Sequence, residues 1–80
     1  MILLIDPDFR PHVKPGWQAC CICGRGVDPN KPHRIAHVLQ AGFFLLLPGE
    51  PVPKDYVDEG WQPIGSDCAE KIGLVWSKPG

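Results

Sequence analysis

The stretch Cys20-Cys21-Ile22-Cys23-Gly24 carries the most specific signal for the fold of this chain. Two cysteines with two residues between them, Cys20 and Cys23, can place both thiolates on one metal ion. The glycine that follows lets the chain turn sharply and leaves backbone N–H groups free to donate to sulfur. This pattern is typical of a zinc knuckle, a tight turn that supplies two ligands of a structural zinc ion.

A second segment, near the C-terminus, offers a third thiolate. Asp67 is a favourable N-cap, Glu70 can complete a capping box, and Gly73 suits the position just after a helix. These signals predict a helix of about two turns over residues 67–72. Cys68 then lies in the first turn, where the positive end of the helix dipole favours a thiolate.

A structural zinc ion normally has four protein ligands, so the sequence must supply one more. His37 is the preferred candidate, because it lies within a predicted apolar strand, where an imidazole needs a partner. His33 lies on the same face of that strand but at the edge of a loop, and Asp67 and Cys21 are further alternatives. The predicted metal site therefore consists of Cys20, Cys23, His37 and Cys68.

The segment between the two cysteine motifs predicts a β-hairpin. Residues 35–39 place Ile35, His37 and Leu39 on one face and Ala36 and Val38 on the other, as in a strand. The continuous apolar run at 43–47 is typical of a strand buried on both faces. Gln40-Ala41-Gly42 suits the turn between them, with Gly42 able to adopt positive φ. We expect this hairpin to form most of the core.

The remaining sequence predicts little regular structure. We expect an extended, proline-rich lead-in with a short strand at 2–5 over residues 1–18, a zinc-binding domain over 19–80, and a solvent loop over 48–60. The predicted fold class is α+β: a zinc knuckle, a β-hairpin and a short C-terminal helix. That element order is the order of a treble-clef zinc finger, a fold group with many functions.

Chain length and the short apolar segments indicate what class of protein this is. Eighty residues make one domain with a marginal core, which a metal or disulfides would support. Met1–Ile5 is too short for a signal peptide and Phe43–Leu47 too short to span a bilayer, so we expect a cytoplasmic protein without membrane contact. In that reducing compartment, clustered cysteines favour a metal over disulfides.

Other roles for the cysteines compete with zinc binding. Cys20 and Cys68 could be plain buried thiols, and four cysteines could form two disulfides. The spacing of Cys20 and Cys23 also matches a thioredoxin-like redox pair. Such a pair opens a helix, and Gly24, Gly26 and Pro29 disfavour a helix after Cys23.

Three groups of residues carry a family resemblance. They are Cys20-x-x-Cys23-Gly24-Arg25, His37-Val38 with Gly42 following, and Gly60-Trp61-x-Pro63-Ile64-Gly65-x-Asp67-Cys68-Ala69-x-Lys71. With this pattern, the stretch from Cys20 to about Gly73 resembles small uncharacterised zinc-ribbon-like proteins of bacteria and their phages. The resemblance implies a structural zinc site and the element order above, and it implies no activity.

The sequence favours a binding module over an enzyme, because it holds no recognisable set of nucleophile, base and orienting group. Tryptophan is enriched at binding hot spots, although the three tryptophans could equally seal the small core. The predicted partner-binding residues are Trp17, Trp61, Trp76, Arg25 and Arg34. We expect a protein partner, in one version a host defence complex that a phage-encoded protein inhibits. Nucleic-acid binding through Arg25, Lys31 and Arg34 is the alternative, which the net charge of −1 disfavours.

Overall fold

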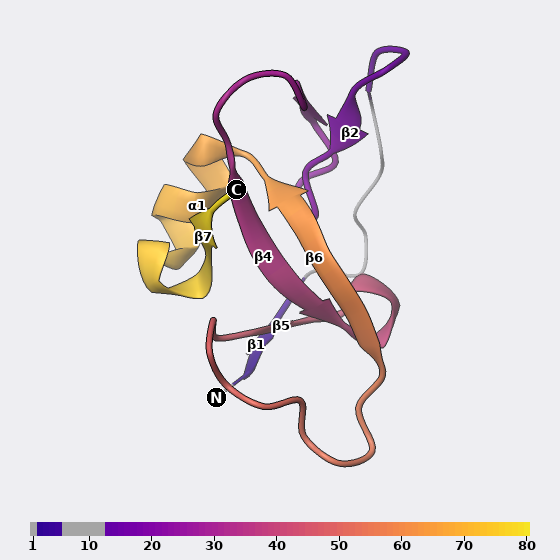
Figure 1. The fold of residues 1–80 in the computed structure, drawn as a ribbon, viewed down its shortest axis with the longest axis vertical. Helices are drawn as coiled ribbons and strands as arrows, with labels where there is room; N and C mark the ends of the chain where they lie inside the picture. Colours follow the sequence, from indigo (N-terminus) through magenta and orange to yellow (C-terminus); the bar gives the residue numbers. More distant parts are fainter. Residues whose placement is uncertain (1, 6–12) are drawn as a thin grey trace.

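The computed structural model describes residues 2–5 and 13–80, and its main feature is an antiparallel sheet (Figure 1). The sheet has the strand order β1-β5-β4-β6, and β7 pairs with the start of β4. The bounds are β1 Ile2–Leu4, β4 Arg34–Leu39, β5 Phe44–Leu46, β6 Asp58–Ile64 and β7 Lys78–Pro79. The molecule is a small α+β domain, because a short C-terminal helix, α1 (Ser66–Ile72), accompanies these strands.

A second, smaller sheet lies at one end of the molecule. It pairs β2 (Gln18–Ala19) with β3 (Gly26–Val27), and the cysteine turn connects the two strands. Figure 1 shows this small sheet beyond one end of β4 and β6, while the loop after β5 lies at the opposite end. We call residues 18–27 the knuckle unit. The part of the predicted lead-in at 6–12 lies outside the described residues.

The predicted hairpin is confirmed. β4 pairs with β5, with His37 opposite Leu46 and Leu39 opposite Phe44. A 3₁₀ turn at Gln40–Gly42 joins them, and Gly42 has the expected positive φ of 98°. The strand predicted near the N-terminus is also present, and β1 pairs with β5 in the same sheet.

The core lies between one face of the sheet, α1 and the segment that follows α1. Ala36 and Val38 of β4 are fully buried there, which matches the predicted alternation. The cluster also takes in residues from the knuckle unit and from the C-terminal 3₁₀ turn, Leu74–Trp76. Its members are Ile5, Cys20, Cys21, Val27, Ala36, Val38, Leu45, Ile64, Cys68, Ala69 and Trp76. The core is thus larger than the hairpin alone.

Two sequence predictions need correction. The loop predicted over 48–60 is too long, because residues 58–60 begin β6, which pairs along β4. β6 is an edge strand, so its polar residues and Pro63 are tolerated where a central strand would exclude them. The helix begins at Ser66 with Gly65 in the N-cap position, so Asp67 lies in the first turn instead of capping it. The predicted end at Gly73 is confirmed, with φ of 102°.

Candidate metal centre

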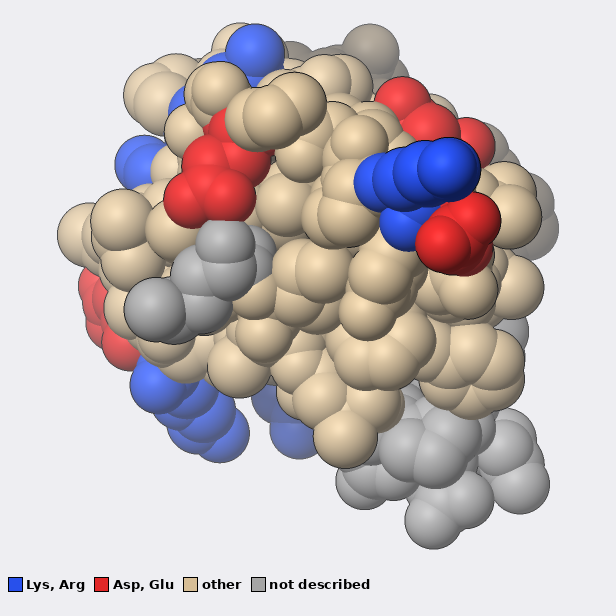
Figure 2. All heavy atoms as spheres, turned by 90° about the horizontal axis from the view of Figure 1, so that it is seen from below, with Lys and Arg blue, Asp and Glu red and all other residues tan. Residues whose placement is uncertain are grey.

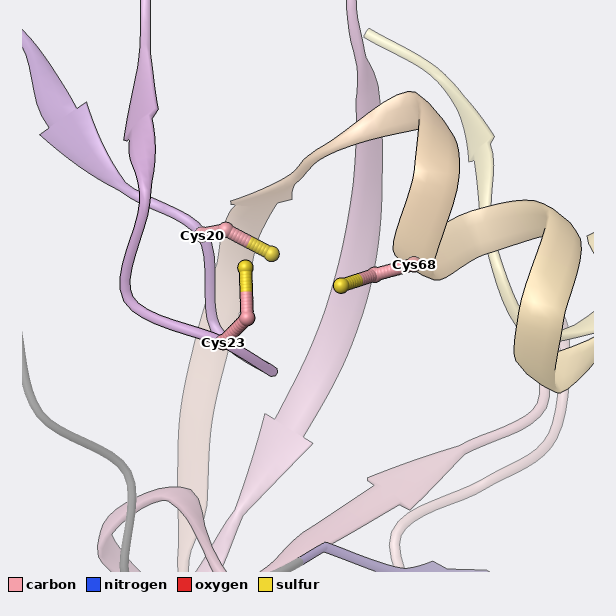
Figure 3. A group of neighbouring side chains, drawn as sticks. All are labelled: Cys20, Cys23 and Cys68. Atoms are coloured by element: carbon pink, nitrogen blue, oxygen red, sulfur yellow. The ribbon is translucent and has the colours of Figure 1, made fainter.

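Three cysteines from two distant segments meet where the knuckle unit faces α1. The sulfur atoms of Cys20, Cys23 and Cys68 all lie within 4.8 Å of one another. Figure 3 shows the three side chains pointing toward a common point, two from the turn between β2 and β3 and one from α1. The sequence prediction that these three residues come together is therefore confirmed.

Local hydrogen bonds shape the turn that presents two of these thiols. The N–H of Gly24 donates to the carbonyl of Cys20 at 2.9 Å, and the N–H of Cys20 donates to the carbonyl of Arg25 at 2.8 Å. Gly24 has φ of 79°, a conformation that L side chains rarely adopt. The glycine after the second cysteine therefore closes the turn, as its position in the motif predicts.

Contacts with the end of β6 hold this turn against the main sheet. The N–H of Cys21 donates to the carbonyl of Pro63 at 3.0 Å. The N–H of Gly65 donates to the sulfur of Cys20 at 3.2 Å, and its carbonyl accepts from Ala69 at 2.9 Å to start α1. Gly65 thus links the knuckle sulfur directly to the first turn of the helix.

The environment favours a thiolate at Cys20. Burial disfavours the charged form, but backbone N–H groups that donate to the sulfur outweigh it and keep the pKa of the Cys20 thiol below its ordinary value. The donors are the N–H groups of Gly65, Cys23 and Ile22. Hydrogen bonds of this kind orient a thiolate and support it as a metal ligand.

The environment of Cys68 instead favours the protonated thiol. Burial raises the pKa of its thiol to about 12, and the neighbouring sulfurs of Cys23 and Cys20 contribute to the increase. Several thiolates close together repel one another, so they need a cation to ionise together. The group therefore fits a metal ion such as zinc, which binds thiolate sulfur at about 2.3 Å and removes the protons outright.

Cys21 belongs to the core and not to this group. Its side chain is buried, and burial followed by the charge of Cys20 raises the pKa of its thiol to about 12. A buried, protonated thiol behaves as a small apolar side chain. Cys21, one of the open alternatives for the fourth ligand, is therefore placed apart from the three sulfurs.

His37, the fourth ligand that the sequence predicts, does not lie with the three sulfur atoms. Among the described residues the group of side chains that could hold a metal contains only the three cysteines, whereas His37 contacts Asp58 and Trp61. Its Nε2 is 2.7 Å from Oδ1 of Asp58, and its ring stacks on Trp61 with 4.8 Å between centroids. Asp58 was missed because the sequence placed it in a loop, whereas β6 places it beside His37.

A cavity of about 650 Å³ opens next to the three thiols. Its wall contains two of the remaining candidates for the fourth ligand, His33 and Asp67. The wall also carries four basic side chains, those of Arg25, Lys31, Arg34 and Lys71. Asp28 is a second acidic residue in the wall. The three thiols are thus open on one side to a space of the size that small-ligand sites have.

The predicted partner-binding residues separate into exposed and internal ones. Trp17 and Trp61 are 36% and 39% exposed, and Arg25 is exposed. Trp76 is only 8% exposed and packs in the core, so it seals the core from one side. Arg34 donates from Nε to Oγ of Ser77 at 2.7 Å and from Nη2 to the carbonyl of Ser77 at 2.8 Å, so much of its guanidinium is used inside the fold.

Comparison of the chain with protein-family models, with curated proteins and with solved structures finds no match. The cysteine cluster that the sequence resemblance implied is present, and the resemblance itself gains no further support. Within residues 2–5 and 13–80, no helix has the length and apolar character needed to cross a membrane.

Proposed function

We propose that Cys20, Cys23 and Cys68 bind one structural zinc ion that fastens the knuckle unit to the start of α1 in a treble-clef-like arrangement. The observation that carries this proposal is the convergence of three thiols from segments far apart in the sequence, within 4.8 Å of one another. Structural zinc in small finger peptides binds with an apparent free energy of about 10–16 kcal/mol at neutral pH, and that energy is coupled to folding. One ion could therefore fix both segments.

The test is the zinc content of protein purified without chelators. We expect about one zinc per chain for the wild type, as for other structural sites of this kind. Cys20→Ser should lose the metal, whereas Cys21→Ser, a matched change one residue away, should retain it. Wild-type protein without metal would contradict the proposal, and so would retention of zinc by Cys20→Ser together with its loss from Cys21→Ser.

We propose further that the zinc-stabilised domain is a module that binds a protein partner. The support comes from Trp61, which lies on an edge strand with 39% of its surface exposed and is fixed in place by two neighbours. The ring of His37 stacks on it, and Nζ of Lys78 lies 4.2 Å from the centre of its ring. An exposed tryptophan that is already held in one orientation costs little entropy when it binds.

Capture of partners from an extract of the source cell, with zinc-loaded protein as bait, tests this role. Trp61→Ala should lose a specific partner that the wild type retains, and Val57→Ala, which changes another exposed apolar side chain, should keep it. Equal recovery by the wild type and Trp61→Ala would contradict a role for this tryptophan.

Nucleic-acid binding gains less support than protein binding. The basic residues near the thiols share their surface with Asp28 and Asp67, and Arg34 is bound to Ser77. Figure 2 shows the end of the molecule opposite the knuckle unit; this face is mostly uncharged, with Lys and Arg in small separate groups, some of them beside Asp and Glu. Phosphate backbones instead attract continuous basic surfaces.

A further inference from the structure

The cavity beside the three thiols holds a histidine that could complete the metal site. His33 lines this cavity together with Cys20, Cys23 and Cys68. It ends the loop at 28–33, which connects the knuckle unit to β4. The chain thus returns to the thiols soon after it leaves them, and it brings an imidazole with it.

A hydrogen bond determines which ring nitrogen of His33 is available. Nδ1 lies 2.9 Å from the backbone carbonyl of Lys31. A carbonyl oxygen only accepts hydrogen bonds, so Nδ1 carries the proton, and in the neutral imidazole Nε2 keeps its lone pair. Metal-binding histidines have this arrangement almost without exception: one nitrogen donates to a carbonyl or carboxylate and the other binds the metal.

The two rivals are less suitable. His37 already directs its Nε2 at Asp58, at 2.7 Å, and its ring is stacked on Trp61. Asp67 lines the same cavity as His33. A zinc ion with three thiolates carries one net negative charge, which a carboxylate ligand would increase and a neutral imidazole would not.

We propose that His33 is the fourth ligand of the metal and binds it through Nε2, an inference that rests on the zinc site proposed above. In the present structure His33 lies outside the group formed by the three sulfur atoms. Metal binding must therefore draw the imidazole across the shared cavity. The carbonyl of His33 accepts from the N–H of Gly80 at 2.9 Å, and residues 29–32 of the loop are exposed, so the proposed movement is one of the His33 side chain and the exposed loop, with the backbone of His33 kept in place. The movement closes the open side of the site, as structural zinc sites require.

The test is nitrogen NMR of the histidine side chains in the full chain during titration with zinc. We expect Nε2 of His33 to shift to the metal-bound position at one equivalent of zinc, while Nδ1 of His33 and both nitrogens of His37 keep their positions. A metal-induced shift at His37 or His12, or at no histidine, would overturn the assignment.

Cobalt(II) separates this inference from the zinc site itself. Sulfur-to-cobalt charge-transfer absorption reports the thiolates, whereas the visible bands report the whole ligand set. His33→Gln should retain the charge-transfer absorption, change the visible bands and weaken metal binding by at least about tenfold. His37→Gln and Asp67→Asn, as matched controls, should leave both spectrum and affinity unchanged. Normal cobalt binding by His33→Gln would overturn the role of His33 alone, and absence of charge transfer in the wild type would overturn the zinc site and this inference together.

Discussion

The knuckle unit and the main sheet are held in place by different means. The main sheet buries large aliphatic side chains completely, among them Val38, Leu39, Leu45 and Leu46. The knuckle unit contributes Val27 and two cysteines to the core, and its strands are two residues each. Each fully buried large aliphatic side chain contributes about 1.5–3 kcal/mol, so packing stabilises the main sheet far more than the knuckle unit.

The weaker packing of the knuckle unit identifies the region where a bound metal would add most to stability. A two-stranded ribbon without a substantial apolar face is not stable by itself in water. In this chain the ribbon is linked to the main sheet by the backbone hydrogen bond from the N–H of Cys21 to the carbonyl of Pro63, and by the sulfur of Cys20, which accepts from the N–H of Gly65. The proposed zinc ion would add its stabilisation where apolar packing is weakest.

Removal of the metal should therefore affect the two regions to different extents, which is the largest effect we expect. With a strong chelator, backbone amides of the knuckle unit should exchange rapidly with solvent, together with those of the first turn of α1. Amides that pair β4 with β5 should remain protected, because their packing does not involve the metal. Hydrogen exchange with and without chelator measures both regions in one experiment.

Uniform loss of protection after chelation would contradict this comparison. It would mean that the metal stabilises the entire domain and that the aliphatic core is insufficient alone. Cys21→Ser provides the control, because it changes the knuckle unit without removing any of the three sulfurs proposed to bind the metal.

Acid should release the metal, and the expected direction follows from Cys68. Burial and then the neighbouring sulfurs raise the pKa of this thiol to about 12, so in metal-free protein at neutral pH it carries a proton that zinc must displace. Zinc affinity should therefore rise with pH, by about tenfold per pH unit for each proton released. Competition with a chelator between about pH 6 and pH 8 measures the slope.

The matched control for this slope is Cys21. The pKa of its thiol is also raised to about 12, chiefly by burial, but its sulfur lies outside the group of three thiols proposed to bind zinc, so it should keep its proton whether or not zinc is bound. Cys21→Ser should show the wild-type slope. An affinity independent of pH in the wild type would contradict metal binding by these thiols.

The parts of the structure that the sequence predicts well are those determined by local rules. The cysteine turn, the hairpin at β4 and β5, and the end of α1 at Gly73 each depend on a few neighbouring residues. The strand β6 escaped prediction because Asp58-Glu59-Gly60 has low strand propensity, and only pairing with β4 makes it a strand.

The residues of the candidate site also divide into those predicted by local sequence rules and those that depend on long-range contacts. Spacing alone indicates which two cysteines share the turn, and a helix signal indicates the third. The choice between His33 and His37 depends on the surroundings that each imidazole reaches and on the partner that it meets there. His37 meets Asp58, a residue whose position requires knowledge of β6, so sequence periodicity could not separate the two histidines.

The C-terminal segment is intermediate between the knuckle unit and the main sheet, because it is held to β4 by polar bonds as well as by the packing of Trp76. Nε of Arg34 donates to Oγ of Ser77, and Nη2 donates to the carbonyls of Ser77 and Leu74 at 2.8 and 3.2 Å. Arg34→Met should lower the free energy of unfolding by about 1.5–3 kcal/mol, since hydrogen bonds to a charged group are lost. Urea unfolding of zinc-loaded protein measures the change.

A change at Arg25 serves as the control for Arg34, because both arginines line the cavity beside the three thiols but Arg25 is exposed. Arg25→Met should alter the free energy of unfolding by less than about 0.5 kcal/mol. If both variants unfold at the same urea concentration, the bonds from Arg34 to the C-terminal segment contribute little.

The smallest effect should come from Asp58, at the end of the sheet far from the thiols. The N–H of Gly60 donates to its carboxylate at 2.8 Å, and His37 contacts the same oxygen at 2.7 Å. The N–H of Gly60, and then His37, lower the pKa of this carboxyl below its ordinary value. A lowered pKa in the folded state stabilises the fold above the ordinary value of about 3.9 and ceases to do so as the pH falls through the folded-state pKa.

Asp58→Asn should therefore be slightly less stable than the wild type at neutral pH, and the difference should disappear in acid. Asp58 is exposed, so solvent screening keeps this effect well below that of Arg34→Met. Urea unfolding of both proteins across the pH range, with His37→Gln to complete a double-mutant cycle, isolates the pair. A difference that grows in acid would contradict stabilisation by the charged carboxylate.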